Sequence, residues 1–458
     1  MLYTSHMQSR GCPPTYYICR LMLHSRLKNN GLVALMIVFV GIPFSVLGKP
    51  LRCEVLAPSA ILINADTGQV LYEKQARIPT FPASTTKIAT ALYSLYLKGD
   101  RPDDLVQISS NAVSAVSPAI RRGGKHPSYR LEFGGSHMSL RTGEQISFNS
   151  LLHGLLVCSG NDAANAIAEY VSGSVPKFME GMNVYLQSIG CLNTHFQNPH
   201  GLPDSEHLTT AYDLARIAHV AMRNAFFCEV VKTTRYLRPK TNVQEQSVLI
   251  QSNALLKSGK FFYPYAMGIK TGYTVAAGSN IVAAAQKGDR RVIAVVLNCE
   301  DSSQRYRSCI GLFEAAFQEV KVERKLLSQE YDSFSRVLDG ASSRLEGVLS
   351  RDVSIEYYPS EESSLSAKCC WDVIELPIKK GDRVGEIQVA NAQGDLVLTE
   401  PVLAKDSVEP TISYCVGRWG RHMMLYVQQN KSYLGGILGF AMILSTYVIF
   451  RSNKRIIQ

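Results

Sequence analysis

The order of strand-like and helix-like sequence between residues 53 and 320 constrains the fold of this chain more than any other feature. Apolar runs typical of strands stand at both ends of this region, and helical apolar spacing fills its middle. Strands that are far apart in the sequence must therefore pair to bury their apolar faces. The pattern predicts an α+β domain whose sheet joins distant parts of the chain.

Local patterns predict the individual elements of this region. Asp66-Thr-Gly68 is a sequence typical of tight turns, so two strands joined by such a turn are expected within 60–72. The expected helices are 87–97, two runs around a short polar interruption within 151–171, 209–222 and 306–317. The expected buried strands are 280–285 and 291–297, with their turn at Gly288-Asp289.

Residues 323–410 have a different pattern of apolar residues. Helical signals fade after the first turns, and short alternating or clustered apolar runs replace them. The expected strands are 353–358, 373–376, 384–389 and 396–399, with turns at Lys380-Gly-Asp and Gln393-Gly-Asp. The segment is predicted to be a small all-β module.

The N-terminal segment has the pattern of a secretory signal. A strongly apolar run over 32–42 follows basic residues and precedes small residues that end at Gly48. We expect residues 1–48 to be a leader and signal peptide cut after Gly48, with an uncleaved anchor as the alternative. Met22 is a more usual start for such a signal than Met1.

The C-terminal segment predicts a membrane anchor. Residues 432–450 carry no charge and are long enough to cross a bilayer. The denser basic cluster in 451–458 predicts a cytoplasmic tail. The preceding 411–431 mixes apolar, aromatic and basic residues, which fits an amphipathic segment on the membrane surface or a flexible stalk. The two ends together place residues 49 to about 430 outside the cytoplasm.

The charge and the cysteine content limit the classes of partner and ligand that are expected. The formal net charge of +10 suits an anionic membrane surface or a carboxylate substrate. Nucleic acid is disfavoured because the chain has no compact Lys/Arg run. No cysteine pair has metal-ligand spacing with histidine, so no zinc site is predicted.

Ser84 and Lys87 are the first candidate catalytic residues. They lie three residues apart at the start of the expected 87–97 helix, where free N–H groups and the helix dipole favour developing negative charge. Lys87 shares a face with Ser84 and can take its proton if burial and nearby positive charge lower the lysine pKa. The alternative is a helix cap beside a surface lysine. The same spacing recurs at two other places. Ser25/Lys28 lies in the expected export signal, and Ser174/Lys177 contains Pro176 just past an expected helix.

Two further motifs follow in the chain. Ser159-Gly-Asn161 interrupts helical sequence, and a kink there can aim a hydroxyl and an amide into a cleft. The alternative is an ordinary helix cap. Lys270-Thr-Gly272 stands in strand-like sequence, where Gly272 lets a ligand approach the backbone and Lys270 can bind a carboxylate. Its alternative is a β-turn with a solvated lysine.

In this order the three motifs resemble the signatures of the penicillin-recognising serine D,D-peptidases. The chain looks most like the low-molecular-mass penicillin-binding proteins that are D-Ala-D-Ala carboxypeptidases. The longer matches are Pro82-Ala-Ser-Thr-Thr-Lys-Ile88, Ser159-Gly-Asn-Asp-Ala163, Asn198-Pro-His-Gly-Leu202, Gly268-Ile-Lys-Thr-Gly-Tyr-Thr274 and Leu376-Pro-Ile-Lys-Lys-Gly-Asp-Arg-Val-Gly-Glu-Ile387. The resemblance covers roughly residues 53–450. It implies a β-lactamase/transpeptidase-like domain, an antiparallel sheet with helices, over 53–320, then a small β domain and a C-terminal anchor.

The resemblance also implies roles for the first two motifs. Ser84 attacks the D-Ala-D-Ala peptide bond of a peptidoglycan pentapeptide and forms an acyl-enzyme, and Lys87 accepts its proton. Ser159 and Asn161 relay protons and position the substrate. Water then releases the shortened peptide, and β-lactams acylate Ser84 because they resemble the substrate's end.

The third motif would hold the substrate. Lys270 and Thr271 bind the terminal carboxylate beside Gly272, and the backbone N–H of Tyr273 joins that of Ser84 in an oxyanion hole. The resemblance implies no cofactor and no metal. It places the enzyme at the bacterial inner membrane, with the catalytic domain on the periplasmic side.

Some positions depart from the family pattern. Residues 117–135 look longer and more basic than usual, and they directly precede the Gly135-Ser-His-Met138 segment that lies near the site in relatives. Tyr273 stands where many relatives have His, although the oxyanion role needs only its backbone. Arg305 is the candidate for a further arginine contact.

Three functions remain open from the sequence. The leading one is a carboxypeptidase that trims cell-wall precursor peptides. The second is a related D,D-endopeptidase or a β-lactamase, although no Glu-x-x-Leu-Asn segment supplies a deacylating glutamate. The third is a non-catalytic penicillin-binding scaffold.

Overall fold

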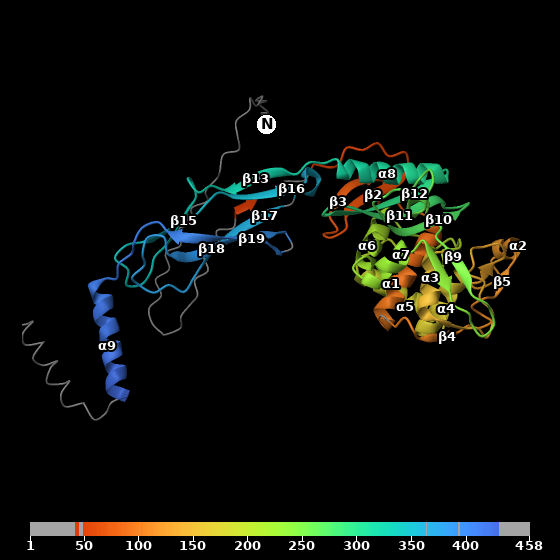
Figure 1. Ribbon diagram of the computed structural model, residues 1–458, viewed down its shortest axis with the longest axis horizontal. Helices are drawn as coiled ribbons and strands as arrows, with labels where there is room; N and C mark the ends of the chain where they lie inside the picture. The colour runs from red at the N-terminus through yellow and green to blue at the C-terminus, as the bar shows by residue number, and fades with distance from the viewer. Residues whose placement is uncertain (1–41, 45–48, 100, 363, 393, 430–458) are drawn as a thin grey trace, which may run out of the picture. The chain divides into compact units, whose positions relative to one another are not determined.

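A five-stranded antiparallel sheet forms the centre of the N-terminal domain (Figure 1). The computed structural model describes residues 42–44, 49–99, 101–362, 364–392 and 394–429. The strand order is β10 (Ala266–Thr274), β11 (Gly278–Lys287), β12 (Arg290–Cys299), β2 (Ser59–Asn64) and β3 (Val70–Lys74). β12 pairs with β2 across more than half of the chain, with Ile293 opposite Ile63. The predicted sheet between distant segments is therefore confirmed.

Helices cover both faces of this sheet, as the ribbon in Figure 1 shows. Because side chains alternate along a strand, Ile61 and Ile63 of β2 face one hydrophobic core and Leu62 faces the other. The first core holds α1 (Lys87–Lys98), α3 (Phe148–Leu156), α4 (Asn161–Ser172), α5 (Val175–Ser188), α6 (Ala211–Ala221) and α7 (Ala225–Lys232). The second core holds α8 (Ser302–Phe317). Helices occupy each segment for which one was predicted.

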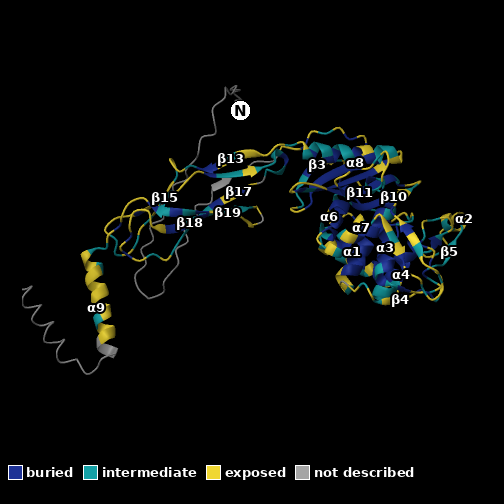
Figure 2. Ribbon diagram, viewed as in Figure 1, coloured by how far each residue is buried: buried dark blue, intermediate teal, exposed yellow. Residues whose placement is uncertain are grey.

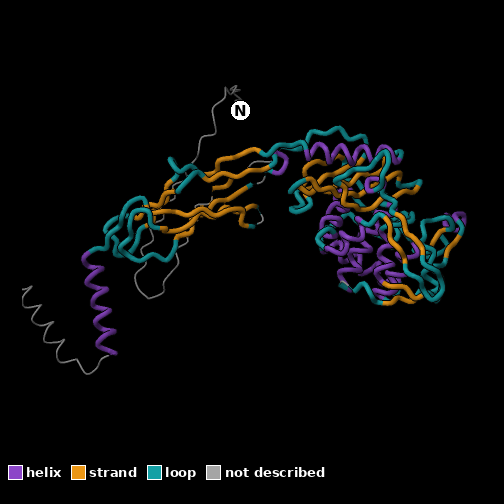
Figure 3. Tube along the Cα trace, in the orientation of Figure 1, coloured by secondary structure: helices purple, strands orange, loops and turns teal. Residues whose placement is uncertain are grey.

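Several short elements around the helical layer were not predicted, because two to five residues carry too little periodicity. Figure 3 shows short strands in orange and a short helix in purple beside the main helices. They are β4 (Leu105–Gln107) paired with β7 (Gln145–Ser147), β5 (Ala115–Val116) paired with β6 (Leu131–Glu132), α2 (Pro118–Arg122), and β8 (Arg235–Arg238) paired with β9 (Ser247–Ile250).

The C-terminal part is an all-β domain, as predicted. One sheet has the order β1-β17-β18-β19-β15-β14, and β13 pairs with β16. The strands are β1 (Ile42–Phe44), β13 (Val322–Leu327), β14 (Ser333–Arg336), β15 (Leu345–Leu349), β16 (Val353–Tyr357), β17 (Leu365–Trp371), β18 (Arg383–Asn391) and β19 (Leu396–Ala404).

The predicted strand at 373–376 is wrong. This segment follows β17 as irregular chain, and Val373 is 98% exposed. Pro377 follows directly and has no N–H to donate to a strand ladder, so the apolar cluster cannot continue as a strand. The expected helical turns after residue 323 are wrong as well, because β13 occupies them.

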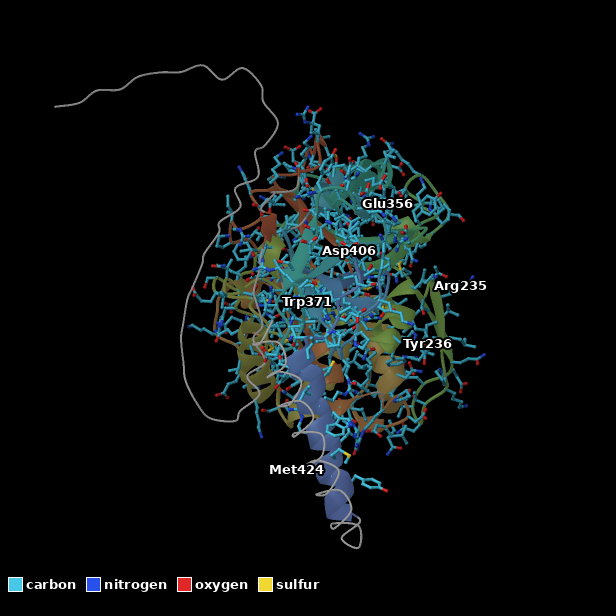
Figure 4. The ribbon with its side chains drawn as sticks, turned by 90° about the vertical axis from the view of Figure 1, so that its left-hand side faces the viewer. Arg235, Tyr236, Glu356, Trp371, Asp406 and Met424 are labelled. Atoms are coloured by element: carbon cyan, nitrogen blue, oxygen red, sulfur yellow. The ribbon has the colours of Figure 1, made fainter. Side chains whose placement is uncertain are left out.

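The last described element is α9 (Ile412–Gln429), within the predicted amphipathic segment. Most of its described residues are exposed in Figure 2, including Trp419 and Met424, and Figure 4 labels Met424 on this helix. No helix among the described residues has both the length and the apolar character to cross a bilayer. The predicted span 432–450 and nearly all of the predicted signal peptide lie outside the described residues.

Phe313 of α8 provides a test of the second core. Its side chain is fully buried, and its ring stacks on Tyr263 with centroids 5.6 Å apart. Phe313→Ala should cost about 3–5 kcal/mol and lower the melting midpoint, followed by circular dichroism at 222 nm, by roughly 10 °C. The control Val275→Ala, at a position 93% exposed, should leave the midpoint unchanged. Equal midpoints would mean that α8 does not stabilise the sheet.

Candidate active site

Ser84 lies on a single 3-10 turn, η1 (Ala83–Thr86), that leads straight into α1. The turn is held from within, because the Thr85 hydroxyl donates to the Pro82 carbonyl at 2.8 Å and the Thr86 hydroxyl donates to the Ala83 carbonyl at 2.9 Å. Every other residue of the turn is buried, and Ser84 alone is half-buried. The turn therefore presents one hydroxyl at the start of a helix.

Lys87 is fully buried directly behind this hydroxyl. Its Nζ lies 2.9 Å from Ser84 Oγ, 2.7 Å from Asn161 Oδ1 and 2.7 Å from the carbonyl oxygen of His200. Burial lowers the pKa of Lys87 well below its usual range, and the positive charge of Lys270 lowers it further. The sequence analysis required burial and a nearby positive charge for Lys87 to act as a base, and the structure shows both.

The neighbours of Lys87 also fix the direction of proton transfer. A neutral amine has two N–H groups and one lone pair. The amide oxygen of Asn161 and the carbonyl of His200 can only accept, so they take the two N–H groups. The lone pair then faces Ser84 Oγ, and the hydroxyl donates its hydrogen bond to Lys87.

Ser159 and Asn161 lie at the junction of α3 and α4, as the interrupted helical pattern predicted. Ser159 has a φ of 66°, an uncommon left-handed conformation that turns the chain between the helices. Asn161 contacts Lys87 directly, and its backbone N–H donates to the Ser136 carbonyl at 2.8 Å. The Ser159 side chain has no hydrogen-bond partner among the described residues, so of this motif Asn161 makes the direct contact with the pair.

The third motif lies on β10, an edge strand of the central sheet that contains Lys270, Thr271, Gly272 and Tyr273. Lys270 is buried, and its Nζ donates to the Thr271 carbonyl at 2.9 Å. The Thr271 hydroxyl lies 3.3 Å from Ser252 Oγ. Gly272 faces the Ser84 turn closely, because a Cβ there would lie 2.9 Å from the Ser84 backbone nitrogen. This part of the strand therefore forms a wall beside Ser84.

Two positive charges flank that wall. Burial lowers the pKa of Lys270 to about 7, and Arg305 acts in the same direction. Arg305 Nη1 donates to the Gly272 carbonyl at 3.2 Å, so the arginine singled out by the sequence supports the back of the strand. The Tyr273 side chain is 63% exposed and has no part in this packing, which leaves its backbone at the wall.

The loop 198–202 is a part of the site whose role the sequence did not predict. The His200 carbonyl is one of the three partners of Lys87. Gly201 has a φ of 91°, and a Cβ there would lie 1.9 Å from the Ala83 carbonyl oxygen. Only glycine allows this close approach. The signal was present as Asn198-Pro-His-Gly-Leu202, but nothing in the sequence pairs a backbone carbonyl with Lys87.

Asn280 is a second residue that sequence reasoning missed. Its Nδ2 donates to the carbonyls of Phe81 and Pro82 at 2.9 and 3.1 Å, and its Oδ1 accepts from the backbone N–H of Asn298. Asn280 thus ties the Ser84 turn to β11 and β12. A buried asparagine inside an apolar strand was the available signal.

Two family models match this chain. One, described as D-alanyl-D-alanine carboxypeptidase, matches residues 47–301. The other, described as penicillin-binding protein 5, C-terminal domain, matches residues 324–410. The first covers more than half of the chain, and the two leave residues 1–46, 302–323 and 411–458 unmatched.

Individual relatives agree with these matches. The chain is 32% identical to the D-alanyl-D-alanine carboxypeptidase DacF of Bacillus subtilis, over 77% of this chain and 86% of that protein. It is 30% identical to the D-alanyl-D-alanine carboxypeptidase DacC of Escherichia coli, over 76% of this chain and 83% of that protein. Among solved structures it is similar to penicillin-binding protein 6B from Escherichia coli, with a TM-score of 0.54, 26% identity, and coverage of 77% of this chain and 96% of that one. Penicillin-binding protein 5 from Haemophilus influenzae gives a TM-score of 0.53 at 25% identity, with coverage of 79% and 100%.

The contact between Gly201 and Ala83 gives a test of the site geometry. Gly201→Ala should push the Ser84 turn away from Lys87, abolish acylation of Ser84 by fluorescent penicillin, and lower the melting midpoint. Gly143→Ala is the matched control, because Gly143 has a similar φ of 81° but open space around its Cβ position. It should cost only the backbone strain, about 1 kcal/mol, and keep full labelling. Equal labelling of the two variants would contradict the close-approach argument.

Proposed function

Because this chain belongs to the peptidase S11 family of D-alanyl-D-alanine carboxypeptidases, we propose that it removes the terminal D-alanine of peptidoglycan pentapeptides through an acyl-enzyme on Ser84. It is a serine-type carboxypeptidase, a hydrolase of the penicillin-binding family. The observation that carries the assignment to Ser84 is the 2.9 Å contact with the buried Lys87. Its neutral amine is a base aimed at one hydroxyl.

The first step forms the acyl-enzyme. Lys87 takes the Ser84 proton while Ser84 Oγ attacks the carbonyl carbon of the D-Ala-D-Ala peptide bond. The negative charge on the carbonyl oxygen is stabilised by the backbone N–H groups of Ser84 and Tyr273, an assignment supported by the close approach of Gly272, the neighbour of Tyr273, to the Ser84 nitrogen. The C–N bond then breaks, and the proton held by Lys87 passes through the Ser159 hydroxyl to the leaving D-alanine amine, which returns Lys87 to its neutral form.

The second step releases the shortened peptide. A water molecule gives a proton to Lys87 and attacks the ester carbonyl, and Ser84 leaves with that proton. Asn161 keeps the Lys87 amine oriented in both steps through the 2.7 Å contact. Protonated Lys270 and the Thr271 hydroxyl bind the substrate's terminal carboxylate, which selects a peptide with a free C-terminus.

This selectivity favours the carboxypeptidase over its alternatives. A D,D-endopeptidase cuts inside a cross-link, and a buried cation placed for a terminal carboxylate suits a free chain end better. Scaffold and β-lactamase functions are not favoured by the family match. We propose that residues 53–320 act in the periplasm, that 323–410 form the separate β domain, and that the segments after it hold the protein at the inner membrane.

Replacement of the proposed nucleophile tests this function. Ser84→Ala should abolish labelling by fluorescent penicillin and lower the release of D-alanine from a pentapeptide by at least about a thousandfold. The chain offers a matched control in its other described Ser-x-x-Lys pair, since Ser174 only caps α5. Ser174→Ala should keep both activities.

Two results would contradict parts of the proposal. Equal labelling of Ser84→Ala and the native protein would show that another residue is acylated. Labelling of the native protein without release of D-alanine would favour the scaffold.

The two buried lysines predict a bell-shaped pH profile of kcat/KM. Acid protonates Lys87 and removes the base, so the rate falls as the pH decreases through its lowered pKa. Alkali removes the Lys270 charge, with a pKa of about 7, so carboxylate binding weakens as the pH rises through that value. The same peptide with a C-terminal amide has no carboxylate for Lys270 to bind. Its kcat/KM should still fall at acid pH but should no longer fall at alkaline pH. Identical profiles for acid and amide would contradict the role of Lys270.

A further inference from the structure

His207 is a buried side chain beside the Ser84 turn that the proposed mechanism does not use. The residue is only 1% exposed, and its ring stacks on Phe196 with centroids 4.8 Å apart. The backbone N–H of Gln197 donates to its Nδ1 at 2.9 Å. His207 Nε2 lies 2.9 Å from the hydroxyl oxygen of Thr86, which belongs to the η1 turn. The ring is therefore held by residues 196–197 and contacts the turn that carries the nucleophile.

These contacts determine the tautomer of the His207 ring. Because Nδ1 accepts the Gln197 N–H, it carries no proton, and the proton of the neutral ring lies on Nε2. The Thr86 hydroxyl has one proton, which it donates to the Ala83 carbonyl. The hydroxyl oxygen therefore accepts from His207 Nε2–H. Burial lowers the pKa of His207 to about 3, so the ring is neutral at neutral pH and keeps this arrangement.

The resulting hydrogen bonds run in one direction, from His207 through the Thr86 hydroxyl to the Ala83 carbonyl. This carbonyl and the N–H of Ser84 belong to the same peptide group, which is planar and trans. The two groups point in opposite directions, so a contact that fixes the carbonyl also fixes the direction of the N–H. The Ser84 N–H is one of the two groups that the proposed function places in the oxyanion hole.

This peptide group needs support because Ala83 has an uncommon backbone conformation. Its φ of 51° lies in the left-handed region, which residues with a side chain rarely adopt. A residue stays in this region only where its surroundings hold it there. Asn280 holds the chain before Ala83 through two carbonyls. The Thr86 hydroxyl holds the carbonyl of Ala83 itself, and His207 holds that hydroxyl.

We propose that His207 is a positioning residue that acts through Thr86 and aims the Ser84 N–H at the carbonyl oxygen of the scissile bond. The inference rests on the proposed function, because it assigns a support to one of the oxyanion donors named there. A hydrogen bond to the Ala83 carbonyl also draws electrons from that amide, which makes the Ser84 N–H a stronger donor. His207 thus acts on the transition state without touching the substrate.

Two substitutions of His207 in the full chain separate its contact with Thr86 from its contact with Gln197. His207→Gln places an amide N–H at the position of Nε2 and should keep most of the activity. His207→Asn is one methylene shorter, so it can accept the Gln197 N–H but cannot reach Thr86. It should lower kcat for D-alanine release about ten- to a hundredfold, less than the loss of a whole oxyanion donor. KM should stay unchanged, because the oxyanion forms only in the transition state.

Substitutions of Thr86 test whether the effect passes through its hydroxyl. Thr86→Val removes the hydroxyl at nearly constant volume and should lower kcat as much as His207→Asn does. Thr86→Ser keeps the hydroxyl and should keep most of the activity. The double variant of Thr86→Val and His207→Asn should be no slower than either single variant, because both break the same chain of hydrogen bonds.

The acyl-enzyme provides a readout that a loss of stability alone would not change. Its ester carbonyl accepts hydrogen bonds from the oxyanion donors, and such bonds lower the carbonyl stretching frequency. With penicillin isotopically labelled at the β-lactam carbonyl carbon, infrared difference spectra should show this band at higher frequency in His207→Asn and Thr86→Val. The band should keep its native frequency in His207→Gln.

His153 offers a matched control for the loss of a buried histidine. It lies on α3, and its buried ring stacks on Tyr236 with centroids 3.9 Å apart. His153→Asn should lower the melting midpoint, as His207→Asn should, but leave kcat and the ester band unchanged.

The outcomes distinguish this inference from the function on which it rests. Native kcat and a native ester band in His207→Asn overturn the inference and leave the carboxypeptidase assignment intact. Equal losses in His207→Gln and His207→Asn also overturn it, since the contact with Thr86 would then have no effect. If His207→Asn does not fold, an unchanged kcat and band in Thr86→Val overturn it instead. If the native protein releases no D-alanine, the proposed function itself fails and the inference with it.

Discussion

The contact on which this active site depends is that of the buried Lys87 amine with its three oxygen partners. Ser84, Asn161 and His200 come from three separate parts of the chain, and each presents an oxygen within 2.9 Å of Nζ. Burial away from water favours the neutral form of a lysine amine. Because Asn161 Oδ1 and the His200 carbonyl can only accept hydrogen bonds, they take the two N–H groups, and the lone pair faces Ser84. The turn at Ser84, the junction between α3 and α4, and the loop 198–202 must all be in place for that direction to be set.

The sheet provides what helices alone cannot, an open strand edge beside the serine. β10 is the edge strand, so the backbone groups on its outer side have no neighbouring strand within the sheet. A peptide substrate can pair with such an edge while its carboxylate reaches Lys270. Gly272 and Gly201 allow β10 and the loop to approach the Ser84 turn from different directions. Asn280 joins the same turn to β11, so the nucleophile is fixed to the sheet that presents the substrate.

The sequence predicted the elements well where apolar periodicity was long, and it predicted the site residues from three short motifs. The helices α1, α4 and α8 and a sheet that joins distant segments follow from patterns of six or more residues. The strand expected at 373–376 failed because the pattern there is short and Pro377 interrupts it. The role of His200 could not be predicted, since a backbone carbonyl has no side-chain signature. A recognisable motif does not guarantee a contact either. Ser159 belongs to such a motif, but its hydroxyl makes no hydrogen bond with Ser84 or Lys87 in this structure.

The site contains two buried lysines, and their different surroundings give them different tasks. Burial, together with the positive charge of Lys270, holds the pKa of Lys87 well below its usual range, so in the proposed mechanism Lys87 serves as the base. Lys270 keeps a pKa of about 7 and so remains partly charged at neutral pH, ready for a carboxylate. In the proposed mechanism a carboxylate bound there stabilises the Lys270 cation. Carboxylate binding would therefore hold Lys270 in its charged form as well as position the peptide bond, and an uncharged chain end would forfeit both effects.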